Sequence, residues 1–148
     1  MLADELKLRI VRRFAVTPDT VFDALTNPAA MKIWWGDDAI IETDLRVGGR
    51  WRITRQEDGV EYVAVGEFLA IERPFRLIYT FAMPQFSPNS DTISFEIKAD
   101  ENGCVVTFEQ SGEDTTRELS ELPPGIVSQS EAGWQQGFDL MAAAWERG

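Results

Sequence analysis

The stretch Ser128–Arg147 constrains the fold of this chain most, because it has the pattern of one long amphipathic helix. Ser128 and Glu131 have the spacing of a capping box at its start. Large apolar side chains recur at helical spacing and would form a single stripe: Trp134, Phe138, Met141 and Trp145. A stripe this broad needs a wide apolar surface to cover it. No second long helix is predicted, so the partner should be a β-sheet.

Two glycines, Gly133 and Gly137, lie one turn apart inside this helix, although each costs about 1 kcal/mol relative to alanine there. Their missing side chains leave a smooth strip on the helix surface. Either a strand or a bound ligand could come close to this strip, or the glycines are simply tolerated near a helix start.

The chain before this helix predicts one strand, two short helices and a run of further strands. The first strand covers residues 6–16, and Thr17-Pro18 is typical of a helix start with Thr17 as N-cap. Asn27-Pro28 ends that helix and begins a second, which Gly36 ends. The further strands are predicted at 39–44, 50–55, 61–71, 76–81, 91–99 and 104–110.

Alternation of apolar and polar side chains along most of these strands indicates antiparallel pairing with one buried and one wet face. The acidic segment 113–124 ends in Pro-Pro-Gly and predicts an exposed loop with room for one helical turn. The expected fold class is therefore α+β. A strongly curved antiparallel sheet of six to seven strands wraps around the long C-terminal helix, in a single domain over residues 1–148.

Composition narrows the classes of partner. Residues 84–148 hold 3 Lys/Arg against 12 Asp/Glu, a net of −9 out of −11 for the chain, so binding of nucleic acid or anionic lipid is not expected. No apolar run approaches the ~20 residues of a membrane span, and residues 1–10 lack the order of a signal peptide. The single cysteine, Cys104, excludes an internal disulfide and agrees with a reducing cytoplasm, which is the expected location.

The chain contains no histidine, which removes the commonest general base and the commonest metal ligand. No catalytic residue, metal or cofactor is therefore predicted. An enzyme would have to use Tyr79 or a carboxylate for proton transfer. The acidic residues near the second helix match no calcium loop and are interpreted as a solvated turn: Asp37, Asp38, Glu42 and Asp44. Nothing in the sequence lowers the pKa of Cys104, which is interpreted as a small buried residue.

Short motifs follow one another along nearly the whole chain: Val21–Thr26, Trp34-Trp35-Gly36, Val47-Gly48-Gly49-Arg50-Trp51, Gly66-Glu67-Phe68, Ile71-Glu72-Arg73-Pro74 and Gly133-Trp134. In this order they resemble the START-like, or SRPBCC, superfamily with the helix-grip fold, and within it the branch of Hsp-ninety ATPase activator homologues. The resemblance implies an apolar cavity between sheet and helix that binds hydrophobic small molecules. It also implies two other classes, a co-chaperone-like protein-interaction module and, in a minority, a cyclase or hydrolase. Many relatives carry a histidine at the position of Gln110. Many also carry one just before the Gly-Trp pair, where this chain has Ser130 or a residue next to it.

The candidate ligand-binding residues are the large side chains expected to face the inner space, together with one amide: Trp34, Trp51, Tyr79, Phe81, Phe95, Phe108, Gln110, Trp134, Phe138 and Met141. The same aromatic pattern is equally typical of a solid core. Tyr79, Gln110 and Glu67 could orient a ligand, although Glu67 is expected to face solvent. Residues 83–89 are either a lid or an ordinary connection.

Binding of a hydrophobic small molecule is thus the first hypothesis from the sequence. The second is a protein-interaction module whose acidic half meets a basic partner, and an enzyme comes third. Either a monomer or a homodimer is compatible with this sequence.

Overall fold

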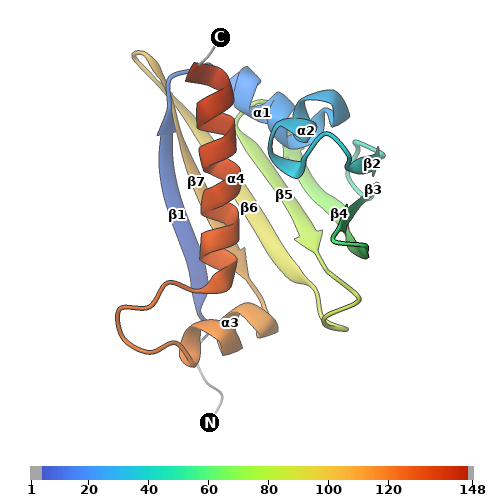
Figure 1. The fold of residues 1–148 in the computed structure, drawn as a ribbon. Coiled ribbons are helices and arrows are strands. Elements are labelled where there is room, and N and C mark those ends of the chain that lie inside the picture. Colours follow the sequence, from blue (N-terminus) through green and yellow to red (C-terminus); the bar gives the residue numbers. More distant parts are fainter. Residues whose placement is uncertain (1–4, 147–148) are drawn as a thin grey trace.

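In the computed structural model, residues 5–146 are described, and over this range the chain forms seven strands and four helices (Figure 1). They follow one another as β1 (Lys7–Phe14), α1 (Pro18–Thr26), α2 (Pro28–Trp35), β2 (Ile40–Thr43), β3 (Arg50–Glu57), β4 (Val60–Glu72), β5 (Arg76–Phe81), β6 (Asp91–Asp100), β7 (Gly103–Ser111), α3 (Glu113–Ser120) and α4 (Gln129–Glu146). The predicted α+β class is confirmed, and the elements follow the predicted order with α3 as an addition. The predicted helix end at Arg147 lies outside the described residues.

The strands form one antiparallel sheet in the order β1-β7-β6-β5-β4-β3-β2. β4 is the longest strand, and it pairs with β3 through its first part and with β5 through its second. The register shifts between Phe68 and Ala70 where the pairing with β5 is established. Such a bulge bends the strand and increases its twist, which helps this sheet to curve.

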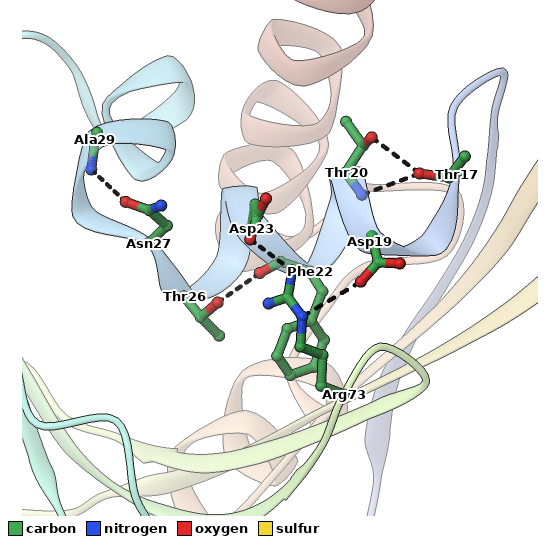
Figure 2. Close-up of polar contacts among 9 residues, drawn as sticks. All are labelled: Thr17, Asp19, Thr20, Phe22, Asp23, Thr26, Asn27, Ala29 and Arg73. Atoms are coloured by element: carbon green, nitrogen blue, oxygen red, sulfur yellow. Dashed lines mark hydrogen bonds and ion pairs between the residues drawn. The ribbon is translucent and has the colours of Figure 1, made fainter.

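The two short helices begin and end at the predicted residues. The Thr17 side chain accepts a hydrogen bond from the backbone N–H of Thr20, and Asn27 accepts one from Ala29 (Figure 2). Asn27 therefore ends α1 and caps α2, while Gly36 ends α2 with a positive φ of 107°. These signals fix where the tryptophans at the end of α2 lie.

Arg73, in the turn after β4, fastens the sheet to α1 (Figure 2). Its guanidinium donates to Asp23 at 2.8 Å and lies 3.3 Å from Asp19. The same group sits 5.2 Å from the centre of the buried Phe22 ring, within range of a cation–π contact. These contacts join the turn after β4 to α1, and because the charged groups are half-exposed they add only modestly to the buried packing of Phe22 and Leu25.

α4 lies along the sheet, with α1 and α2 beside its C-terminal part and α3 at its other end (Figure 1). Ser128 Oγ accepts the backbone N–H of Glu131 at 3.0 Å, which is the serine half of the predicted capping box. Phe138 and Met141 of the predicted stripe are buried. The ring of Phe108 in β7 lies 5.9 Å from that of Phe138, so rings from sheet and helix pack directly on each other.

Arg12 is a charged residue on the inner face of the edge strand β1. It shares that face with the buried Ile10 and Phe14 and reaches up to α4. Its Nη1 donates to Gln135 Oε1 at 2.7 Å and lies 2.9 Å from an Asp139 carboxylate oxygen. An inward-facing charge is a common device at sheet edges, and here it also ties β1 to α4.

The sequence predicted an exposed loop with room for one helical turn over residues 113–124, but α3 forms two helical turns over Glu113–Ser120. The acidic residues Glu113 and Asp114 occupy its first turn, where they complement the helix dipole. Thr115 is buried and donates a hydrogen bond to Asp91 of β6, and Leu119 packs against the core. Tertiary contacts therefore stabilise a helix that the polar composition did not predict.

Candidate functional site

A cleft of about 390 Å³ opens between α2 and α4 above the inner face of the sheet. α2 contributes Trp34 and Trp35, and α4 contributes a strip that includes Gly133, Trp134 and Gly137. The remaining lining residues come from β3, from β5 and the segment after it, from β7, and from polar or apolar positions of α4: Arg55, Glu57, Phe81, Met83, Gln110, Gln129, Ser130, Gln136 and Leu140. The lining thus combines four aromatic side chains with six polar or charged ones.

The missing side chain of Gly137 brings the two helices together. A Cβ built at Gly137 would lie 3.0 Å from Cε3 of Trp34, so a larger residue would press on that indole. The indole of Trp34 is also held by a 2.7 Å hydrogen bond from its Nε1 to the carbonyl oxygen of Ala24. Its ring lies 5.8 Å from that of Trp134. The strip predicted from the two glycines therefore accommodates an α2 side chain at this position.

Gly133 has the opposite surroundings. A Cβ built there would meet no atom within 4 Å, and the residue lines the cleft. Within one turn of α4, the helix therefore contacts α2 at Gly137 and borders open space of the cleft at Gly133.

A chain of hydrogen bonds fixes the floor of the cleft. Trp134 Nε1 donates to Gln110 Oε1 at 2.9 Å, and Gln110 Nε2 donates to Asp91 Oδ2 at 2.8 Å. The same carboxylate oxygen accepts from Thr115 Oγ1 at 2.9 Å. Because the amide nitrogen of Gln110 can only donate, its bond to Asp91 leaves the amide oxygen to accept from the indole. Gln110 and Asp91 are both buried.

A smaller hollow of about 170 Å³ adjoins the cleft at the β3 side and shares Trp35, Arg55, Glu57 and Met83 with it. Met83 is the first residue of the segment predicted to be either a lid or a connection. Further along this segment, Phe86 is exposed and its ring lies 5.9 Å from that of Tyr62. One end of the segment therefore borders the cleft, and its role as a lid stays a prediction.

A third space of only about 10 Å³ lies deeper, among residues of α1, α2 and strands β2 to β5, and Trp35 lines it as well as the cleft. Trp51 and Tyr79 face this inner space, with ring centres 5.2 Å apart. Burial raises the pKa of the Tyr79 hydroxyl well above its ordinary value, so this group stays neutral and is no base at physiological pH.

The candidate residues from the sequence divide into three groups. Four line the cleft: Trp34, Phe81, Gln110 and Trp134. Trp51 and Tyr79 line the inner space. The others are buried in the packed core: Phe95, Phe108, Phe138 and Met141. The Phe108 ring lies 4.5 Å from Trp134 and 5.4 Å from Phe95, so these three rings pack together under α4.

Sequence reasoning missed several residues of the cleft, and only some of them carried a signal. Trp35 was visible as an adjacent tryptophan, and Leu140 as an apolar residue on the outer side of the helix stripe. Arg55 and Glu57 follow Trp51 and Ile53 at every second position of β3, so alternation put them on the inner face, but their charge favoured solvent. Glu67 lines an open groove with Arg50 and Arg52, away from the cleft.

The other sequence candidates are accounted for by simpler contacts. Asp44 pairs with Arg46 at 2.8 Å in the turn before β3. Within residues 5–146, no three potential ligands among Cys, Asp and Glu come together as a metal site. Cys104 is fully buried, and burial raises the pKa of its thiol. None of the helices in the described range combines the length and apolar character of a membrane span.

Comparison with known proteins agrees with this architecture. The solution structure of ChR145 from Cytophaga hutchinsonii has a TM-score of 0.78 at 18% identity and covers 99% of this chain and 97% of that one. NE0264 from Nitrosomonas europaea has a TM-score of 0.76 at 21% identity, covering 96% and 95% of the two chains. CV1439 from Chromobacterium violaceum has a TM-score of 0.73 at 20% identity, covering 94% and 96%.

These likenesses establish the fold. No curated protein matches the chain. The model of one family, described as activator of Hsp90 ATPase homolog 1-like protein, matches residues 15–146. Because this match spans nearly the whole chain, the protein belongs to the family of activator of Hsp90 ATPase homolog 1-like proteins.

Proposed function

We propose that this protein binds a hydrophobic small molecule in the cleft between α2 and α4. The cleft itself is the observation that carries this proposal. Its volume of about 390 Å³ falls within the roughly 300–1,000 Å³ typical of small-molecule sites. Apolar and aromatic side chains beside polar groups at fixed positions are the usual composition of such sites, and this cleft has Trp34, Trp35 and Trp134 beside Gln110. The sequence predicted an apolar cavity between the sheet and the C-terminal helix, and this cleft is bordered by α4 and by the sheet residues Phe81 and Gln110, with α2 as a further wall.

The polar groups of the cleft favour recognition over catalysis. Gln110 has both ends of its amide engaged, by Trp134 and by Asp91. Arg55 and Glu57 stand on the exposed rim. A neutral glutamine is a poor proton acceptor, and the sequence holds no histidine to act as general base. We therefore regard the ligand as bound and released unchanged, in the cytoplasm that the single cysteine suggests.

A thermal-shift experiment tests the proposal. A panel of flat aromatic, steroid and fatty-acid ligands should contain members that raise the melting temperature. By mass action, a ligand concentration of 100 times Kd increases the free energy of unfolding by about 2.7 kcal/mol. Ionic strength should change this stabilisation little, because the contacts are apolar. If every class in the panel leaves the melting temperature unchanged at concentrations near its solubility, the proposal fails.

A second candidate function is a co-chaperone-like protein-interaction module. The family description and the charge of the C-terminal half favour it: residues 84–148 carry a net −9. Its binding to a basic protein surface should weaken as salt increases, and substitutions in the cleft should leave it unchanged. Salt-sensitive association with a protein partner, combined with indifference to all small molecules, would replace the first proposal by this one.

A further inference from the structure

The inner face of the ribbon formed by β3 and β4 runs from the packed core into open space. Side chains pair across this face, first Ile53 with Ala64 and then Arg55 with Tyr62. Ile53 and Ala64 are each 2% exposed, whereas Tyr62 is half-buried and Arg55 is exposed. Because every second residue of a strand points to the same side, the face that covers the core continues into this open part.

The hollow of about 170 Å³ lies over these two cross-strand pairs. Ala64 has only a methyl group opposite Ile53, which leaves depth at this point of the face. Trp35 of α2 and Met83 complete the apolar part of the lining. Transfer of hydrocarbon from water to such a surface is favourable, so the hollow suits an apolar group.

The hollow is an extension of the cleft. The two spaces share four lining residues from α2, from β3 and from the segment after β5: Trp35, Arg55, Glu57 and Met83. Both spaces are open to solvent, so a ligand can lie across their common border. The hollow is smaller than the roughly 300 Å³ at which small-molecule sites begin, which makes it a part of a site and not a second one.

The charges at the common border favour an uncharged ligand. Among the described residues that line the two spaces, the charged ones are Arg55 and Glu57, which have opposite signs. A charged group on the ligand would be attracted by one of them and repelled by the other. It would also lose hydration against the apolar lining.

We propose that the hollow holds the hydrocarbon tail of a ligand whose ring system lies in the cleft. This inference rests on the proposed function and narrows the ligand to an uncharged molecule with two parts. The ring system contacts Trp34 and Trp134, and the alkyl tail lies over Ile53 and Ala64. Met83 borders both parts, and its flexible side chain adapts to the tail.

A series of 2-acylnaphthalenes tests the tail subsite. 2-Acetylnaphthalene, 2-butanoylnaphthalene and 2-hexanoylnaphthalene share the ring system and the carbonyl group and differ only in the length of the alkyl chain. Equilibrium dialysis should give about two- to fourfold tighter binding for each added methylene group, the upper value being that of full burial. In methyl NMR spectra, the Ala64 signal should shift with the hexanoyl ketone and stay in place with the acetyl ketone, because Ala64 lines the hollow and not the cleft.

Two substitutions locate the effect. Ala64→Leu should fill part of the hollow, and Tyr62→Ser should remove one of its walls. Each should reduce the gain in affinity per methylene group and leave the affinity for 2-acetylnaphthalene unchanged. If Ala64→Leu fails to fold, Tyr62→Ser still decides, because Tyr62 is only half-buried. Val63→Leu adds one methylene group at the neighbouring position, on the opposite face of β4, and should retain the full gain.

The outcomes separate this inference from the proposed function. Equal affinity across the series, with shifts of the Trp34 and Trp134 indole N–H signals, would overturn the tail subsite while cleft binding stands. A gain per methylene group that survives in every folded variant of Ala64 and Tyr62 would also overturn it. A series that does not bind at all overturns the two-part ligand, and the thermal-shift panel then decides separately whether the cleft binds any ligand.

Discussion

The Nε1–H of Trp134 donates a hydrogen bond to Oε1 of Gln110 at 2.9 Å, across the junction of α4 and β7. The opposite end of the amide is held by Asp91 on the same inner face of the sheet, so a buried side chain of β6 helps to position the indole at the cleft wall. The ring of Trp134 also contacts those of Trp34 and Phe108. One tryptophan thus belongs both to the packed core and to the proposed binding surface.

The first prediction concerns this hydrogen-bond chain. Gln110→Met should lower the free energy of unfolding by about 1–3 kcal/mol, because it leaves the indole N–H of Trp134 and the Asp91 carboxylate short of a buried partner. Urea unfolding measures the change, and Gln56→Met on the exposed end of β3 is the control. Equal free energies of unfolding for the two variants would show that the Trp134–Gln110–Asp91 hydrogen bonds contribute nothing to stability.

A double-mutant cycle isolates the bond itself. Trp134→Phe should cost less in the Gln110→Met background than in the unsubstituted protein, since the N–H has already lost its acceptor. Additive costs would contradict a direct coupling between the two side chains.

The second prediction concerns Arg12. Arg12→Met should cost about 1–2 kcal/mol, chiefly from the charge-assisted hydrogen bond to Gln135, because Asp139 is largely exposed and its ion pair contributes little. Arg9 lies on the same strand, but it is more exposed and stands 3.6 Å from Glu109. Arg9→Met should therefore change stability by less than about 0.5 kcal/mol. A reversed order in urea unfolding would contradict the inner position assigned to Arg12.

The third prediction concerns the thiol of Cys104. Burial raises its pKa, so the native state holds less thiolate than the unfolded state at any pH near or above the ordinary thiol pKa of about 8.5. A thiol-specific aromatic disulfide should react slowly with the native protein between pH 7 and 9 and rapidly after denaturation. The raised pKa also makes stability depend on pH. Above about pH 8.5 the unfolded state loses the thiol proton first, so the free energy of unfolding falls as pH rises, and Cys104→Ala should lack this contribution. Fast native labelling at pH 7 would show that the thiol is accessible.

The fold was predictable because its signals are local. The caps at Thr17 and Asn27, the strand alternation and the stripe on α4 each depend on residues a few positions apart. The position of β1 beside β7 joins residues about a hundred positions apart, and no sequence pattern encoded it. The inward Arg12 was equally hidden, because a charge on the buried face contradicts simple alternation.

The site was only partly predictable, for a physical reason. Sequence alternation identifies which side chains face inward, but not which of them fill the interior. Phe108 and Trp134 both face inward, yet Phe108 is enclosed and Trp134 borders the cleft. The difference depends on where α2 lies. Gly137 sets the distance between α2 and α4, because the Trp34 indole packs against it.

The fourth prediction tests cleft binding with one added side chain. Gly133→Leu should fill part of the cleft, since a Cβ there meets no atom within 4 Å. The same change should stabilise α4 by about 0.5–1 kcal/mol, because glycine is unfavourable inside helices. Loss of binding with a gain in stability cannot be attributed to unfolding. Ala143→Leu, on the exposed side of the same helix, is the matched control.

The most direct measurement is an NMR titration that follows the five indole N–H signals, one for each tryptophan in the chain. With a ligand selected from the hydrophobic panel, the signals of Trp34, Trp35 and Trp134 should shift saturably, because these residues line the cleft. Trp145, which packs near Phe14 at the other end of α4, should stay unchanged. Gly133→Leu should abolish the shifts and Ala143→Leu should preserve them. Shifts that persist in Gly133→Leu, or that involve Trp145 alone, would contradict ligand binding in this cleft.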